Sequence, residues 1–341
     1  MTASRHSAAD RFLQQTDWRG GARVRLAGDA SNRKYDRVFH PDTNAPAVLM
    51  DADPTLGEDV RPFVRIAQVL QAAGLSAPRI LAEDSQTGFL LLEDLGDDLF
   101  KRVIAAQPAL EPELYAAAID VLDTLHRAPL PALDAYDAPL MTRMAALAWD
   151  WYRRGTIGPD PAAAARFSAR LEPLLNRLTG KPEVLIQRDY HAENLLWLPG
   201  RQGVARVGLL DFQDAMAGHR AYDLVSLLQD ARRDVPPGIE AAMIARYTEA
   251  NALDPAPFAA AYAALGVQRN LRILGVFARL SLHNGKPHYI DLIPRVWGYL
   301  LRDLDHPALA SIRDMVLADL PAPSRDILQG LKDQCASIPT L

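Results

Sequence analysis

Hydrophobic and polar positions follow two different periods along this chain, and the change of period divides it in two. Up to residue 95, short apolar runs with strand-like patterns alternate with turn-forming residues. After Gly96, apolar residues recur at helical spacing over long segments. The sequence therefore predicts an α+β protein, with a small β-rich part over residues 1–95 and a mostly helical part over residues 96–341.

The N-terminal part is predicted to be a small antiparallel sheet that carries one helix. Apolar residues recur at helical spacing between Asp59 and Ala73, and Gly74 follows as a C-cap. The segments with strand patterns are residues 22–26, 35–39, 47–50, 80–82 and 88–92.

The remainder is predicted to be helical with one interruption. Three brief apolar strands are expected inside the helical region, and an insert of this kind is where a helical lobe can hold a catalytic loop. These strands cover residues 184–186, 195–198 and 204–210. The expected helices cover residues 112–127, 139–153, 161–178, 222–230, 238–251, 257–282 and 289–304.

Composition narrows the possible functions. The chain has 341 residues, 49% of them hydrophobic, and a net charge of −5, which is the profile of a soluble globular protein. It has no basic block, so nucleic-acid binding is not expected. The single cysteine, Cys335, excludes an internal disulfide and a multi-cysteine zinc site.

The N-terminus has no apolar signal region and no apolar run is long enough for a bilayer, so a cytoplasmic protein without membrane association is expected.

Three oxygen-bearing side chains carry the strongest chemical signal. Asp189 lies between two predicted strands, Asn194 follows five positions later, and Asp211 ends the next apolar strand. Phosphoryl transfer needs such residues, because one carboxylate must orient the attacking hydroxyl while oxygen ligands hold Mg²⁺ at the phosphates. Each residue alone has an alternative role in turns or caps. All three in order, between the expected elements, favour a kinase.

The spacing Asp-x-x-x-x-Asn followed by strand-Asp-Phe resembles the catalytic and metal loops of the protein-kinase-like superfamily, and in particular the aminoglycoside phosphotransferase family. This resemblance implies a bilobal fold and the use of ATP and Mg²⁺. It implies that Asp189 is the catalytic base, that Asn194 and Asp211 are metal ligands, and that Asp223 braces the catalytic loop. His191 would give structure to that loop.

Two further segments are similar to nucleotide-binding parts of the same family. One would cover the nucleotide between the first two strands, and the other would form the hinge that binds adenine. The residues implied are Gly28, Ala30, Ser31, Asn32, Arg33 and Lys34 in the covering loop, with Glu93, Asp94 and Leu95 in the hinge.

The sequence departs from the family in two places. Gln187 stands where the family usually has the first histidine of the loop, and Met50 stands where the third strand should carry a phosphate-binding lysine. Arg33, Lys34 and Arg37 are the nearest cations that can replace this lysine. No glutamate partner can be assigned, and Glu58 is only the closest acid.

Six segments carry a narrower resemblance: residues 28–35, 48–54, 88–96, 187–194, 208–214 and 222–230. They resemble the bacterial kinases that phosphorylate N-acetylmuramate and N-acetylglucosamine at the anomeric hydroxyl in cell-wall recycling. The resemblance implies transfer of the ATP γ-phosphate to C1 of an amino sugar. Aromatic faces can stack on sugars and arginines can bind a carboxylate, although core packing is the alternative role of Trp149. Candidate acceptor-binding residues are His191, Glu193, Asp214, Arg220, Trp149 and Arg153.

Two other functions stay open at this point. The chain could be a kinase of another small hydroxyl compound, such as an aminoglycoside or an amino alcohol. It could also be a nucleotide-binding module without turnover, which the methionine at position 50 would permit. The expected assembly is a monomer or a weak dimer.

Overall fold

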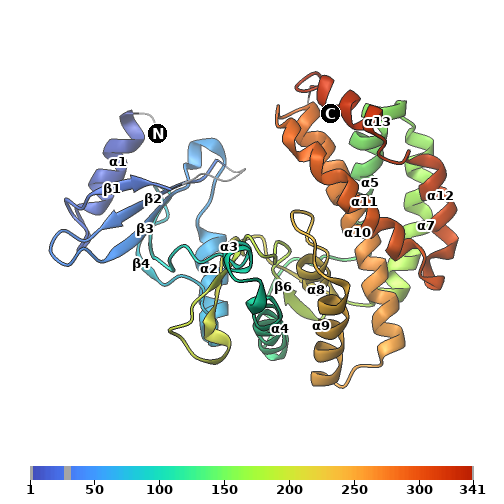
Figure 1. The fold of residues 1–341 in the computed structure, drawn as a ribbon. Coiled ribbons are helices and arrows are strands. Elements are labelled where there is room, and N and C mark those ends of the chain that lie inside the picture. The colour runs from blue at the N-terminus through green and yellow to red at the C-terminus, as the bar shows by residue number, and fades with distance from the viewer. Residues whose placement is uncertain (1–2, 27–31, 340–341) are drawn as a thin grey trace. The chain divides into compact units, whose positions relative to one another are not determined.

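The computed structural model describes residues 3–26 and 32–339 (Figure 1). Gly28, Ala30 and Ser31, predicted to contact nucleotide, lie outside the described residues. The chain forms two compact units, residues 1–125 with 192–215, and residues 126–191 with 216–341. The predicted lobe boundary after residue 95 stays a prediction.

An antiparallel five-stranded sheet forms much of the first unit, in the order β1-β2-β3-β5-β4. Alternation along β3 places Ala47 and Leu49 in one cluster with Phe12 of helix α1, so Met50 points to the opposite face. The predicted sheet is confirmed. Its strands are β1 (Arg23–Arg25), β2 (Lys34–Phe39), β3 (Pro46–Asp51), β4 (Ile80–Asp84) and β5 (Phe89–Glu93).

Helices and a second pair of strands complete the first unit. Helix α2 (Arg61–Ala72) was expected, whereas α1 (Ala3–Leu13) and α3 (Phe100–Ala106) were not, because α1 is largely polar and α3 has only seven residues, too few for a clear helical period. Helix α4 (Glu111–Arg127) belongs to this unit up to Leu125. Strands β7 (Leu195–Trp197) and β8 (Val207–Leu209) pair antiparallel, with Leu195 opposite Leu209.

The second unit is mostly helical, as predicted, and helix α10 runs through its core. Most α10 residues between Phe258 and Leu282 are buried. At Gly275 an added Cβ would lie 2.2 Å from the carbonyl carbon of Leu147, so only glycine allows this close crossing of α10 and α5. The helices are α5 (Ala138–Leu147), α6 (Arg154–Ile157), α7 (Pro161–Thr179), α8 (Ala221–Leu228), α9 (Pro237–Ala250), α10 (Pro255–Leu282), α11 (Ile293–Leu304), α12 (Ala310–Asp319) and α13 (Arg325–Asp333).

Some details of the second unit differ from the sequence-based expectation. The single helix predicted over residues 139–153 is α5 followed by a π-helical stretch, Ala148–Arg153. Strand β6 (Val184–Ile186) pairs with an unexpected strand, β9 (Met216–Gly218), whose small residues show no alternation. Helices α12 and α13 were also not predicted.

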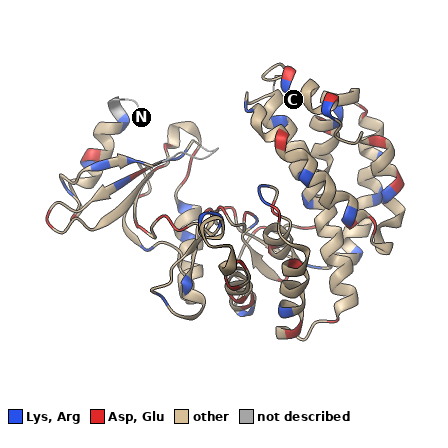
Figure 2. Cartoon of the chain, in the orientation of Figure 1, with Lys and Arg blue, Asp and Glu red and all other residues tan. Residues whose placement is uncertain are grey.

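Acidic and basic residues are intermixed along the helices of the second unit (Figure 2). In the part of the chain that the structure describes, no helix combines the length and apolar character needed to cross a membrane.

Candidate active site

The β7–β8 hairpin positions the two predicted metal ligands. Asn194 directly precedes β7 and Asp211 follows β8, so the antiparallel pairing brings them to the same end of the hairpin. The backbone N–H of Leu210 donates to the carbonyl of Asn194 at 3.0 Å. The side chains of Asn194 and Asp211 are consequently neighbours, with 3.5 Å between Nδ2 and Oδ2.

The conformation of Asp211 is fixed from several directions. Its backbone has φ 56°, a left-handed conformation that aspartate tolerates better than most residues. Gln213 Nε2 donates to Asp211 Oδ1 at 2.7 Å. The next residue, Phe212, is fully buried and packs on Phe63 of α2, with ring centroids 4.7 Å apart. The carboxylate is therefore held by a rigid support.

The side chains of Asn194 and Asp211 suit a magnesium ion that also binds phosphate oxygens. Mg²⁺ takes oxygen ligands and usually binds one or two carboxylates while keeping water and phosphate ligands. Asp211 supplies a carboxylate, and Asn194, whose Nδ2 faces Asp211, would supply its amide oxygen after rotation of the amide group. Among residues 3–26 and 32–339, no group of three or more His, Cys, Asp or Glu side chains could hold a metal by itself.

The segment that carries Asp189 is anchored by Asp223 of α8. The Asp223 carboxylate accepts hydrogen bonds from the backbone N–H groups of Gln187, at 2.6 Å, and Arg188, at 2.9 Å. Burial raises the pKa of Asp223 to about 7, against the effect of these two donors. Arg188 has φ 71°, a strained conformation for a non-glycine residue, and its carbonyl accepts from Ser226 Oγ at 3.1 Å. These hydrogen bonds are the contacts that a bracing role for Asp223 would require, and the role itself stays a prediction.

We expect Asp223→Ala to destabilise the protein by about 2–4 kcal/mol, because it leaves two buried backbone N–H groups without an acceptor. Urea unfolding measures the change. The control is Asp314→Ala, since the Asp314 side chain is 94% exposed. Equal stability of the two variants would contradict the bracing role.

Asp189 is a partly buried carboxylate kept ionised by surrounding cations. Burial acts to raise its pKa, but nearby positive charge outweighs burial and lowers the pKa below its ordinary value. Among the arginines, Arg272 contributes most, followed by Arg269 and Arg188. A carboxylate in this state can accept a proton from a hydroxyl group.

His191 is buried, and its surroundings suit a neutral imidazole. Burial lowers its pKa, although the charges of Asp230 and Asp189 oppose the shift. Its Nε2 lies 3.4 Å from an Arg232 guanidinium nitrogen. These contacts are compatible with the predicted loop-structuring role.

Arg33 forms an ion pair with Glu58. Its Nε donates to Glu58 Oε2 at 2.9 Å, and each side chain is only 14% exposed. Burial lowers the pKa of Arg33, but Glu58 and, more weakly, Asp211 reverse the shift and raise it. Arg33 is thus electrostatically coupled to a predicted metal ligand.

The other candidate cations have different partners. Arg37 Nε donates to Asp94 Oδ2 at 2.5 Å, and its Nη1 donates to Asp97 at 2.9 Å. Lys34 pairs across the sheet with Asp51. Of the three cations, Arg33 therefore has the most suitable position to replace the lysine.

The predicted hinge follows β5. Glu93 accepts a hydrogen bond from Arg201 at 2.8 Å, Asp94 is held by Arg37, and Leu95 is buried. Because both acidic side chains bind arginines, contacts with a nucleotide here would come from the backbone, as the resemblance implies. Asn32 is exposed, two residues before β2.

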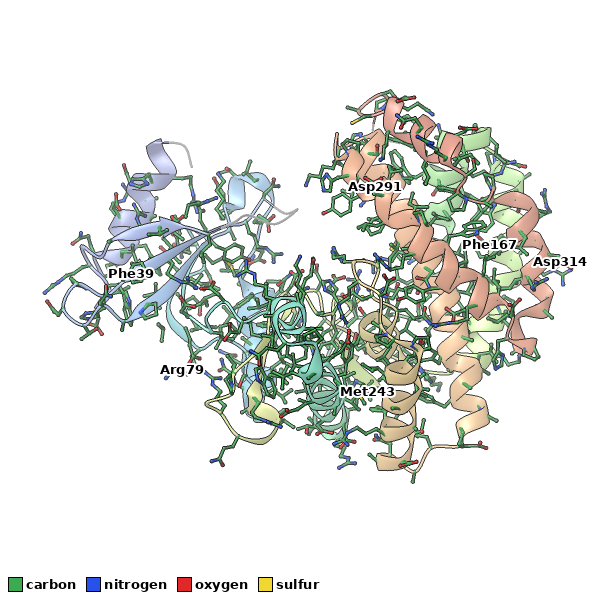
Figure 3. The ribbon with its side chains drawn as sticks, viewed as in Figure 1. Phe39, Arg79, Phe167, Met243, Asp291 and Asp314 are labelled. Atoms are coloured by element: carbon green, nitrogen blue, oxygen red, sulfur yellow. The ribbon has the colours of Figure 1, made fainter. Side chains whose placement is uncertain are left out.

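The predicted acceptor residues Trp149 and Arg153 lie within the second unit. The Trp149 ring is 2% exposed and stacks on Phe167, which Figure 3 labels, at 4.1 Å. Its Nε1 donates to Asp319 at 3.2 Å. The guanidinium of Arg153 binds the carbonyl of Gly158. These contacts favour the core role for Trp149 that was the alternative.

The other predicted acceptor residues, Arg220, Glu193 and Asp214, differ in their contacts and exposure. Arg220 is held by Glu183 at 2.7 Å, which suits a structural role at the start of α8. Glu193 accepts from Lys101 at 2.5 Å. Asp214 is exposed.

Sequence reasoning missed the polar residues of α10. Four of them interrupt an otherwise apolar helix, and this interruption was the available signal: Gln268, Arg269, Asn270 and Arg272. Arg269 is buried, and its Nη2 donates to Ser226 Oγ at 2.8 Å. Ser226 in turn binds the Arg188 carbonyl, so Arg269 supports the backbone beside Asp189.

The antiparallel sheet, the helical region and the Asp-x-x-x-x-Asn loop followed by strand-Asp define a phosphotransferase of the kinase-like class. Comparison with known proteins agrees. The chain belongs to the phosphotransferase enzyme family, whose model matches residues 23–262, and it is an ATP-dependent phosphotransferase. The predicted family is confirmed.

Curated relatives are similar over most of their length. A protein of Caulobacter vibrioides named N-acetylmuramate/N-acetylglucosamine kinase is 41% identical, covering 92% of this chain and 96% of the relative. A protein of the same name from Pseudomonas aeruginosa is 36% identical, covering 87% and 88%.

Solved structures support the fold assignment. An ADP-bound aminoglycoside phosphotransferase matches with a TM-score of 0.58 at 12% identity, covering 92% of this chain and 99% of that chain. Plasmodium vivax ethanolamine kinase matches with a TM-score of 0.58 at 15% identity, covering 85% and 84%. The predicted kinase-like fold is confirmed.

Proposed function

We propose that this protein transfers the γ-phosphate of ATP to the anomeric C1 hydroxyl of N-acetylmuramate and N-acetylglucosamine. The similarity to relatives of that name over most of the chain supports the substrate class. The single observation that carries the chemistry is the ionised, partly buried Asp189 in a segment whose backbone is held by Asp223. The products would be sugar 1-phosphates made in the cytoplasm during peptidoglycan recycling.

Asp189 acts as the base in this proposal. Its carboxylate orients the C1 hydroxyl and accepts the proton as the sugar oxygen bonds to the γ-phosphorus. The bond from the γ-phosphorus to the β–γ bridging oxygen breaks, and ADP leaves with those electrons. Because the transition state is loose, the main contributions of the protein are position and charge.

Asn194 and Asp211 hold Mg²⁺, which supplies positive charge to the phosphate oxygens when bound. The 3.5 Å separation of their side chains and the hydrogen bond from Gln213 support this assignment. The segment before β2 and the hinge Glu93–Leu95 bind the nucleotide, on the family resemblance.

Arg33 takes the place of the missing strand lysine, and Glu58 takes the place of its glutamate partner. Their ion pair would play the part of the lysine–glutamate pair of protein kinases, with an arginine directly before β2 and a glutamate shortly before α2. Met50 then needs no charge, and its burial at 2% exposure is accounted for.

We expect Arg33→Met to raise the KM for ATP and to lower kcat/KM by about 10- to 100-fold, because a charge-assisted contact to phosphate is lost. Steady-state kinetics with varied ATP measures the change. Arg61→Met is the control, since Arg61 is 76% exposed and pairs only with nearby Asp59 in the described contacts. If both variants have wild-type kinetics, Arg33 does not replace the lysine.

An acceptor screen tests the proposed function. Purified protein with ATP and Mg²⁺ is given N-acetylmuramate, N-acetylglucosamine, kanamycin, choline or ethanolamine, and ADP formation is followed. We expect strong stimulation by the two amino sugars. Stimulation by an aminoglycoside or an amino alcohol instead would replace the substrate assignment, and no turnover with any acceptor would favour a nucleotide-binding module.

A further inference from the structure

The guanidinium of Arg272, on α10, forms no ion pair within the part of the chain that the structure describes. It is partly buried, and its one hydrogen bond among the described residues runs from Nη1 to the Tyr222 hydroxyl at a long 3.4 Å. Arginine carries five N–H donors in a planar fork, so most of its donors remain available. A partly buried guanidinium that uses few of its N–H donors can bind a ligand.

The fold places Arg272 near the proposed base. Tyr222, its hydrogen-bond partner, directly precedes Asp223, which holds the backbone N–H groups of Gln187 and Arg188. The charge of Arg272 also acts on Asp189 more strongly than that of any other arginine. Any acceptor whose hydroxyl reaches Asp189 would therefore lie within the field of Arg272.

Three arginines act on Asp189, while two acidic groups, Asp189 and Asp230, act on Arg269 in return. Arg188, Arg269 and Arg272 all act on Asp189, and burial favours the neutral form of Asp223. This balance opposes a cationic acceptor and favours an acidic one. Arg269 is not the ligand-binding residue, because it is 3% exposed and donates a hydrogen bond to Ser226.

We propose that Arg272 recognises the carboxylate of an acidic amino-sugar acceptor. The inference rests on the proposed function and adds a residue that distinguishes the two sugars. N-acetylmuramate carries a lactyl carboxylate that N-acetylglucosamine lacks, and a guanidinium can bind both carboxylate oxygens with two parallel hydrogen bonds. Tyr222 orients the guanidinium through its hydroxyl group.

Arg272→Met separates the two acceptors. We expect kcat/KM for N-acetylmuramate to fall about 10- to 100-fold further than the value for N-acetylglucosamine, because both sugars share any effect of Arg272 on Asp189 and only N-acetylmuramate loses the charge-assisted contact. Arg272→Lys should restore part of the loss. The control is Arg279→Met, a partly buried arginine on the same helix and about two turns further along.

Equal losses for both sugars would overturn the inference, because Arg272 would then serve Asp189 or the phosphate instead. If Arg272→Met does not fold, Tyr222→Phe provides the second test: a loss confined to N-acetylmuramate supports the inference, and equal kinetics for both sugars contradict it. A wild-type protein that phosphorylates neither sugar would instead refute the proposed function, so the two failures are distinguishable.

Discussion

Replacement of Asp189 by Asn is expected to lower kcat by about 10²- to 10⁴-fold, the usual contribution of a general base, while ATP binding is nearly unchanged. The amide keeps the size of the side chain but cannot accept the hydroxyl proton. Steady-state kinetics with the preferred sugar and nucleotide titration together measure the two effects. Asp314→Asn, at a 94% exposed side chain, is the matched control.

An Asp189→Asn variant with wild-type turnover would remove the base assignment. The pH dependence gives a second check. Nearby arginines lower the pKa of Asp189 below its ordinary value of 3.8, so the carboxylate is already ionised at every higher pH. We therefore expect no acid limb from this group above about pH 5, which lies more than one unit above that value. A base that titrates near neutrality would contradict this description of the site.

Replacement of Asp211 by Asn is expected to lower activity at least about 100-fold, since even the outer partners of metal ligands contribute roughly 10- to 100-fold. The neutral amide removes the only carboxylate among the two proposed magnesium ligands. Unlike the Asp189 variant, this one should regain part of its activity as the Mg²⁺ concentration rises. Kinetics over a magnesium series measures the difference.

Gln213→Leu is the comparison variant for this test. Gln213 holds Asp211 by one hydrogen bond at 2.7 Å, so its loss should cause a smaller effect with the same magnesium dependence. If Asp211→Asn lost activity without any response to magnesium, the metal-ligand assignment would be contradicted.

The sequence predicted the fold class and the chemical residues because both depend on local patterns. Period-two and helical spacing identified the sheet and most long helices. Three motif residues, Asp189, Asn194 and Asp211, stand at the ends of short strands, where the pairing of β7 with β8 explains the proximity of the last two. Family resemblance then supplied the bilobal fold and the expected role of each motif residue.

The supporting residues could not be predicted, because their roles depend on contacts between distant segments. Arg33 and Glu58 are 25 positions apart, and only the folded first unit shows that they pair. Arg269 reaches Ser226 across 43 positions. Trp149 shows that residue type alone can also mislead. An aromatic side chain suggested sugar stacking, but Trp149 is buried against Phe167 and has a packing role.

Phosphorus NMR of the reaction products tests the central claim most directly. With wild-type protein, ATP, Mg²⁺ and N-acetylglucosamine, we predict a new phosphomonoester signal split by the anomeric proton, absent with Asp189→Asn. Phosphate on another hydroxyl, or ADP and inorganic phosphate alone with every sugar tested, would contradict the account.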